Sequence, residues 1–160
     1  MAAERTRSFD IVPLNREHLE ALWRHVPEEA RGALESARGI VGRYAGAGDA
    51  WCALQDGAPV AAAGFIEMWP GRATAWAVFG PVDKRYWLRM TRAAARGVAR
   101  AGARWRRIEA YVDAGFPEGC LWARMLGFAP ESRMAAFSPQ GRDALMYVKL
   151  TPDAATGDTP

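Results

Sequence analysis

Three strand-like segments in succession, joined by two tight turns, constrain the fold of this chain more than any other feature. The first two segments meet around Asp56-Gly57, a dipeptide typical of two-residue hairpin turns, and Pro70-Gly71 makes the second turn. Short connections of this kind join strands that run in opposite directions. The pattern therefore predicts an antiparallel meander with strands at residues 51–54, 59–69 and 74–79.

A long helix and a further strand are predicted directly after the meander. Gly80-Pro81 follows the third strand, and the sequence then predicts a helix from Asp83 or Lys84 to Ala101, with Gly102 as its stop. Residues 108–112 are apolar-rich and are predicted to form the next strand.

A second helix is predicted from near Phe116 to Leu126. Pro117 suits its first position, and Gly127 suits a left-handed stop because glycine adopts that backbone conformation without a steric penalty. Phe128 is then expected to fold back onto the last turn around Ala123. The apolar side chains of this predicted helix recur at helical spacing on one side, at Leu121, Trp122, Met125 and Leu126.

The two ends of the chain add strands and helices to this arrangement. Residues 8–14 alternate as a strand, and Asn15 is predicted to cap a helix with an apolar face. A weaker helix is predicted from Pro27 to about Arg38, followed by a glycine-rich loop at 39–49. Two closing strands are predicted at residues 134–137 and 145–150, with a turn at 138–141 between them.

Length and composition predict one globular domain. The chain has 160 residues, half of them apolar, and no apolar run approaches the length of a membrane span. We expect a single domain over residues 1–150, a flexible tail at 151–160 and a cytoplasmic location, because the first residues lack a secretory signal. Two cysteines do not make a disulfide framework, and the net charge of +3 favours anionic ligands.

The element order resembles that of the GNAT acyltransferases, the GCN5-related family that usually moves an acetyl group from acetyl-CoA to an amine. The resemblance covers nearly the whole chain and is best at residues 78–81, 101–103 and 126–128. It implies an α/β fold with a mixed, mostly antiparallel sheet of about seven strands, one splayed parallel pair and four flanking helices. Residues 69–71 and 126–149 resemble small GNAT-like proteins of phages and prophages more closely, some of which are virion components.

The resemblance implies acetyl-CoA as co-substrate. The family places its pyrophosphate at a glycine-rich loop, but at those positions this chain has Lys84, Arg85 and Trp87, so cationic side chains would replace backbone amides. The predicted cofactor-binding residues are those of the third strand's end and of this loop with the following turn: Ala77, Phe79, Lys84, Arg85, Tyr86 and Arg89.

Acyl transfer to an amine needs a base, and often an acid for the departing thiolate. The family's tyrosine acid corresponds here to Ala123, which leaves Tyr111 and Tyr147 as candidate donors. Glu67 and Glu109 are strand carboxylates among apolar neighbours, and partial burial would raise the pKa of either one. The alternative for each is an ion pair with a neighbouring arginine. We predict Glu67, Glu109 and Tyr111 as catalytic residues.

Loss of the glycine loop and of the tyrosine leaves a second class open, a catalytically inactive GNAT-fold protein of phage or prophage origin. Five arginines recur at intervals of four, three, four and four on the long helix, and such a row would suit nucleic acid, although an outward helix face is normally charged. The five are Arg85, Arg89, Arg92, Arg96 and Arg100. His18 and His25 lack partners at ligand spacing, so we predict no metal site.

Overall fold

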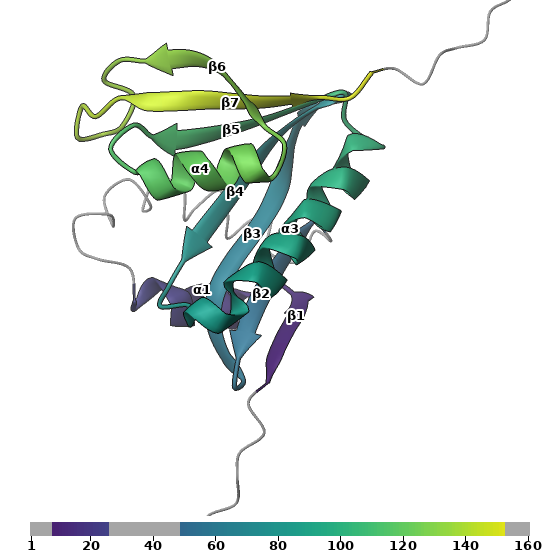
Figure 1. Cartoon of the computed structure of the whole chain (residues 1–160), viewed down its shortest axis with the longest axis vertical. Coiled ribbons are helices and arrows are strands. Elements are labelled where there is room, and N and C mark those ends of the chain that lie inside the picture. Colours follow the sequence, from purple (N-terminus) through teal and green to yellow (C-terminus); the bar gives the residue numbers. More distant parts are fainter. Residues whose placement is uncertain (1–7, 26–48, 153–160) are drawn as a thin grey trace, which may run out of the picture. The chain divides into compact units, whose positions relative to one another are not determined.

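A computed structural model of the chain describes residues 8–25 and 49–152 (Figure 1). Within these residues seven strands form one mixed sheet in the order β1-β2-β3-β4-β5-β7-β6, with three α-helices. The predicted mixed sheet with one parallel pair is therefore confirmed. The predicted helix at 27–38 and the tail from residue 153 onward lie outside the described residues.

The strands differ in length, and the meander strand β3 is the longest. They are β1 (Phe9–Pro13), β2 (Ala50–Gln55), β3 (Ala58–Trp69), β4 (Arg72–Phe79), β5 (Arg107–Asp113), β6 (Ala129–Met134) and β7 (Ala144–Leu150). The helices are α1 (Arg16–Trp23), α3 (Trp87–Gly102) and α4 (Pro117–Met125), with a single 3₁₀ turn, η1 (Lys84–Tyr86), before α3.

The described residues divide into two compact units. The first comprises residues 8–25, 49–64 and 77–93. In it β1 pairs with β2 and β2 with β3, both antiparallel, and the predicted turn at Asp56-Gly57 has positive φ at both residues, 51° and 80°. Its core includes Phe9, Val60 and Met90.

The second unit comprises residues 65–76 and 94–152. The first half of β4 runs parallel to β5, in a register from Arg72↔Arg107 to Ala75↔Ala110. β7 pairs antiparallel with both β5 and β6, and α4 packs against β5 (Figure 1). The one parallel pair that the resemblance implies is therefore formed by β4 and β5.

The end of α4 follows the prediction closely. Gly127 has a φ of +88°, and the Phe128 amide donates to the Ala123 carbonyl oxygen at 3.1 Å. Because a residue with a Cβ adopts this φ only under strain, glycine is the residue that allows the chain to leave the helix here. Phe128 is buried, as expected for a residue that folds back onto the helix.

Two predicted boundaries are wrong. β6 spans Ala129–Met134, whereas the sequence predicted 134–137, because nearly all of β6 is exposed at a sheet edge and its Pro130 and charged residues hide the strand pattern. The long helix α3 begins only at Trp87, after η1, and Gly102 is its last residue, not a stop beyond it.

Candidate functional site

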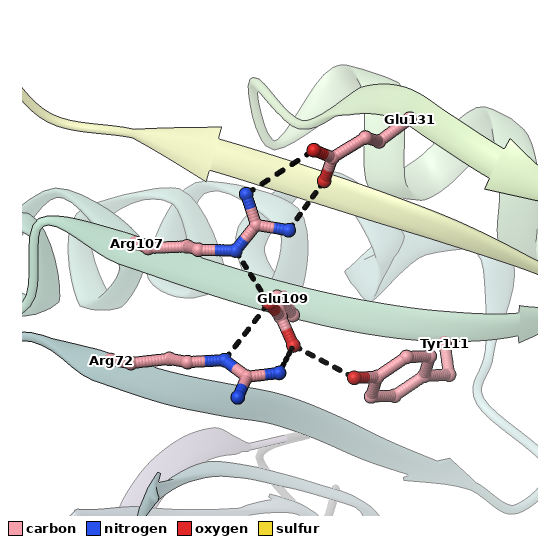
Figure 2. Close-up of polar contacts among 5 residues, drawn as sticks. All are labelled: Arg72, Arg107, Glu109, Tyr111 and Glu131. Carbon is pink, nitrogen blue, oxygen red and sulfur yellow. Dashed lines mark hydrogen bonds and ion pairs between the residues drawn. The ribbon is translucent and has the colours of Figure 1, made fainter. Parts of the chain in front are cut away.

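A buried carboxylate on β5 organises the polar side chains of the second unit (Figure 2). Residues alternate across a strand, so Arg107, Glu109 and Tyr111 share one face of β5. Glu109 accepts hydrogen bonds from both of these neighbours, at 2.5 Å from Arg107 Nε and 2.7 Å from Tyr111 Oη. Only 1% of Glu109 is exposed.

Arg72 completes the group from the neighbouring parallel strand. Its Nε and Nη2 donate to the two oxygens of Glu109, at 2.9 and 2.6 Å, in the paired geometry that suits a carboxylate. The register explains the contact, since Arg72 at the start of β4 lies opposite Arg107. Arg72 also stacks on Trp69, with its Cζ 4.2 Å from the ring centroid.

A second carboxylate, Glu131 on β6, continues the network outward. Arg107 Nη1 and Nη2 donate to its oxygens at 3.3 and 2.5 Å (Figure 2). Strands β4, β5 and β6, the last separated from β5 by β7, therefore contribute to one row of charges that alternates in sign. We call Arg72, Arg107, Glu109, Tyr111 and Glu131 the Glu109 network.

The network fixes the protonation states of its members. Burial alone would raise the pKa of Glu109, but the hydrogen bonds from Arg72, Arg107 and Tyr111 outweigh it and lower the pKa to about 2. The pKa of Tyr111 is raised, first by burial and then by its bond to the Glu109 carboxylate. At neutral pH the site therefore holds an ionised Glu109 and a protonated phenol.

The prediction that burial raises the pKa of Glu109 is therefore wrong. Partial burial was foreseen correctly, but the two arginines reverse its effect on the pKa. The alternative of an ion pair with a neighbouring arginine describes the observed contacts.

Tyr111 presents its ring to a second aromatic side chain. It stacks on Phe137, with centroids 5.3 Å apart and planes inclined by 24°. Phe137 is 51% exposed, so this aromatic pair reaches the surface. Because the phenol donates its hydrogen to Glu109, the aromatic pair offers a ligand a flat apolar surface and a phenol oxygen that can accept a hydrogen bond.

Glu67 lies apart from the Glu109 network in its contacts. It is exposed, which contradicts the partial burial predicted for it, and its Oε2 accepts a hydrogen bond of 2.6 Å from Trp105 Nε1. Trp105 is 1% exposed and its ring packs near Phe65 at 5.7 Å. Glu67 therefore satisfies a buried indole while its own side chain stays at the surface.

The predicted cofactor-binding residues lie in the first unit. Ala77 and Phe79 belong to the second half of β4, and the loop with its 3₁₀ turn carries Lys84, Arg85 and Tyr86. Tyr86 is buried and its ring stacks on Phe9 at 5.0 Å, so this side chain belongs to the core.

Asp83, which the sequence analysis did not propose as a site residue, binds Arg85 in this loop. Asp83 caps η1 by accepting from the Arg85 amide at 3.1 Å, and it pairs with Arg85 Nε at 2.8 Å. Arg89 Nη2 donates to the Phe9 carbonyl oxygen at 3.2 Å, while Lys84 is exposed. Asp directly before a helical turn is a common cap, so the sequence did contain a signal for it.

In this loop the groups that could bind an anion are therefore cationic side chains and not free backbone amides. Asp83 already occupies the Arg85 amide, and its carboxylate repels an anion at this helix start. Lys84, Arg85 and Arg89 are all exposed and offer three positive charges within two turns.

Two buried polar atoms have no hydrogen-bond partner within the described part of the chain, Trp76 Nε1 and Tyr147 Oη. Tyr147 is fully buried, and burial and Cys120 raise its pKa. Within residues 8–25 and 49–152, no cluster of three or more His, Cys, Asp or Glu side chains could hold a metal ion. None of the helices there combines the length and apolar character that a bilayer crossing requires.

No protein-family model matches the chain, and no curated protein is similar to it. Solved structures are similar to it over most of its length. One is an acetyltransferase of the GNAT family from Bacillus anthracis, with 14% identity and a TM-score of 0.64 over 89% of this chain and 95% of that chain.

Two further structures extend this comparison. Ribosomal-protein-alanine N-acetyltransferase from Brucella melitensis has 16% identity and a TM-score of 0.66, covering 88% of this chain and 99% of that chain. The yncA protein of Salmonella typhimurium, solved with its cofactor acetyl-CoA, has 12% identity and a TM-score of 0.62, covering 95% and 99%. At these identities the comparison establishes the GNAT fold, which confirms the fold predicted from the sequence.

Proposed function

We propose that this protein transfers an acetyl or related acyl group from an acyl-CoA to an amine. The observation that carries the proposal is the parallel pair within a GNAT fold, whose register ends at Ala75↔Ala110 although β4 continues to Phe79 and β5 to Asp113. A strand that continues beyond its ladder presents backbone to a ligand. The fold neighbours support the proposal, since they are acetyltransferases and one was solved with acetyl-CoA.

The proposed co-substrate site uses the first unit. We propose that the backbone of Ala77 and Phe79 faces the pantetheine arm, as the resemblance implies, and that Lys84, Arg85 and Arg89 hold the phosphates. Their guanidinium and ammonium groups form charge-assisted hydrogen bonds with phosphate oxygens. Arg85 would have to leave Asp83 for a phosphate, which makes Asp83 a competitor at this site.

The proposed reaction is direct attack. The amine nitrogen forms a bond to the thioester carbonyl carbon as the carbon–sulfur bond breaks, a base takes the amine's proton, and an acid protonates the departing thiolate. We assign the acid to Tyr111, because its raised pKa keeps the phenol protonated at neutral pH. Its O–H would turn from Glu109 to the departing sulfur and transfer its proton there.

The two carboxylates receive different roles. Glu67 is exposed and has no arginine partner among the described residues, so we assign the base to it. The low pKa of Glu109 makes it a weak base, and we propose that it positions Tyr111 through their 2.7 Å hydrogen bond. The aromatic pair Tyr111–Phe137 would then border the acceptor.

The first test is binding followed by turnover. Calorimetry with acetyl-CoA should give measurable heat, and release of free coenzyme A thiol should depend on an added amine. Glu67→Gln and Tyr111→Phe should each lower the rate of thiol release by roughly 10²-fold or more while leaving acetyl-CoA binding intact. Absence of heat at millimolar acetyl-CoA would reject the proposal.

The alternative is a catalytically inactive protein that keeps the GNAT fold, such as a phage or prophage component. Two observations favour it: Asp83 lies in the loop that corresponds to the family's pyrophosphate loop, and Ala123 stands at the position of the family's tyrosine acid. A fold can persist after its site is lost. Thiol release separates the two, because an inactive protein releases no coenzyme A thiol in response to an added amine.

A further inference from the structure

The outer face of α3 carries arginines that no part of the proposed acyltransferase site uses. At 3.6 residues per turn, Arg92, Arg96 and Arg100 project within a narrow sector of the helix. Met90, Val98 and Ala101, which face the opposite way, are buried. We call Arg92, Arg96 and Arg100 the α3 arginine row.

The structure divides the five arginines of the sequence pattern into two groups. Arg85 is paired with Asp83, and Arg89 donates to the Phe9 carbonyl oxygen. The members of the α3 arginine row are exposed, and no hydrogen bond or ion pair ties any of them to another described residue. Their guanidinium groups are therefore available to an external ligand.

The local sequence strengthens the positive field of this face. Lys or Arg occupies nine positions between residues 84 and 108, and Asp or Glu occupies none. An exposed helix usually mixes both signs at i, i+4 spacing, which neutralises its surface. α3 has no acidic residue at all, although the whole chain has a net charge of only +3.

The spacing of the α3 arginine row indicates the kind of anion. Successive members are four residues apart, or about 6 Å along the helix axis, so the row presents evenly spaced charges over about 12 Å. A nucleic-acid backbone is a regular series of phosphates, and arginine binds phosphate through two parallel N–H donors.

Other partners fit this face less well. A protein interface needs several apolar anchors, but on this face the one large apolar side chain is Leu88, one turn before Arg92, and the residues among the arginines are small, such as Ala99. A membrane-surface helix buries an apolar face in lipid, whereas the apolar face of α3 is already buried in the protein.

We propose that the α3 arginine row binds the phosphate backbone of a nucleic acid. The contacts would be independent of base sequence, because the exposed polar side chains of α3 are all arginines, which bind phosphate. The inference does not depend on acyl transfer, since none of the three arginines belongs to the proposed co-substrate or catalytic residues.

Fluorescence anisotropy with a labelled 24-base-pair DNA duplex of mixed sequence tests the proposal. Three phosphate contacts predict that binding weakens about 40-fold between 50 and 200 mM salt. The triple variant Arg92→Gln, Arg96→Gln, Arg100→Gln should lose at least tenfold in affinity at 50 mM salt, and its salt slope should fall by about 2.7. Circular dichroism of each variant verifies folding.

A matched control removes the same charge elsewhere. The variant Arg16→Gln, Arg24→Gln, Arg133→Gln changes exposed arginines outside residues 84–108, and like the first variant it lowers the net charge from +3 to 0. It should keep affinity within about threefold of the unchanged protein.

Three outcomes would overturn the proposal. The first is absence of duplex binding by the unchanged protein at 50 mM salt, and the second is equal loss in the two variants, which would indicate net charge alone. The third is tighter binding of a labelled polyglutamate peptide than of the duplex, which would assign the surface to an acidic protein. Acetyl-CoA calorimetry on the same samples reports separately on the proposed acyltransferase function.

Discussion

Glu109 is the residue on which the polar contacts of the second unit converge. Replacing it with Gln removes the charge that faces Arg72 and Arg107 but keeps the side chain's shape. We expect the free energy of unfolding to fall by about 2 to 3 kcal/mol, less than the 3 to 5 kcal/mol typical of a fully buried pair, because the side chains of both arginines are 25–30% exposed. Urea denaturation at pH 7 measures this loss.

Glu131→Gln is the matched control for that substitution. It removes a carboxylate from the same network, but the Glu131 side chain is 46% exposed, and exposed ion pairs contribute at most about 1 kcal/mol. If both variants lost the same stability, burial would not be what makes Glu109 important.

Glu109 also predicts how stability depends on pH. Its pKa in the folded protein is about 2, below the ordinary value of 4.5, so the unfolded chain binds the proton first as the pH falls. The stabilisation is complete above pH 4.5 and is lost between pH 4.5 and 2. This loss lowers the free energy of unfolding by about 3 kcal/mol. Denaturation at pH 6, 4 and 3 should show this loss in the unchanged protein and a much smaller one in Glu109→Gln.

Residue-level contacts were only partly predictable. The alternation Arg107, Glu109, Tyr111 already indicates three polar side chains on one strand face. Arg72 lies 37 positions from Glu109, so their contact depends on the register of a parallel pair that no local pattern encodes. The contact of Trp105 with Glu67 was equally hidden, because the two residues lie 38 positions apart and Trp105 belongs to the connection between α3 and β5.

At the scale of single elements, the glycine that ends α4 and a glycine inside α3 give opposite expectations. Gly127→Ala should lower the free energy of unfolding by about 1 kcal/mol or more, since its φ of +88° strains any residue with a Cβ. Gly97→Ala, inside α3, should raise it by about 0.5 to 1 kcal/mol, because an added Cβ meets nothing within 4 Å and alanine favours helix. Thermal denaturation of both variants checks the signs, and a gain at Gly127 would contradict the cap.

The ends of elements could be predicted where the local backbone conformation determines the residue type. The turn at Asp56-Gly57 and the cap at Gly127 were predicted correctly because a positive φ selects the residue type at each. β6 was misplaced because its pairing with β7, and not its own pattern, makes it a strand. Its Pro130 is tolerated at the sheet edge, next to an irregularity in the register between Pro130 and Ser132.

For the whole molecule, the order of elements sufficed to predict the sheet. Short turns fix antiparallel neighbours, and a long helix between β4 and β5 is the usual connection of a parallel pair. The contacts in the loop after β4 were harder to predict from the sequence. Asp83 caps the turn and pairs with Arg85, and a comparison with the family's glycines does not reveal either contact.

Acetyl-CoA binding should stabilise the whole molecule, because a ligand that binds only the folded state adds to the free energy of unfolding. At ten times its Kd this gain is about 1.4 kcal/mol, a rise in Tm of about 4 °C for a chain of this size. Arg85→Glu should weaken binding about 30-fold, since it loses a charge-assisted contact and adds repulsion, together about 2 kcal/mol. Arg96→Glu, which lies outside the proposed phosphate site, should leave the Tm shift unchanged.

Asp83→Asn supplies the opposite change at the same place. Asparagine still accepts from the Arg85 amide and caps the helical turn, so the protein without ligand should keep its stability, while the Arg85 guanidinium is released from its ion pair with a carboxylate. Removing about 1 kcal/mol of repulsion should tighten acetyl-CoA binding about fivefold and enlarge the Tm shift. If Asp83→Asn weakened binding while Arg85→Glu and Arg96→Glu behaved alike, the phosphates would not lie at this loop, and the positive charge of α3 would have to serve another anion.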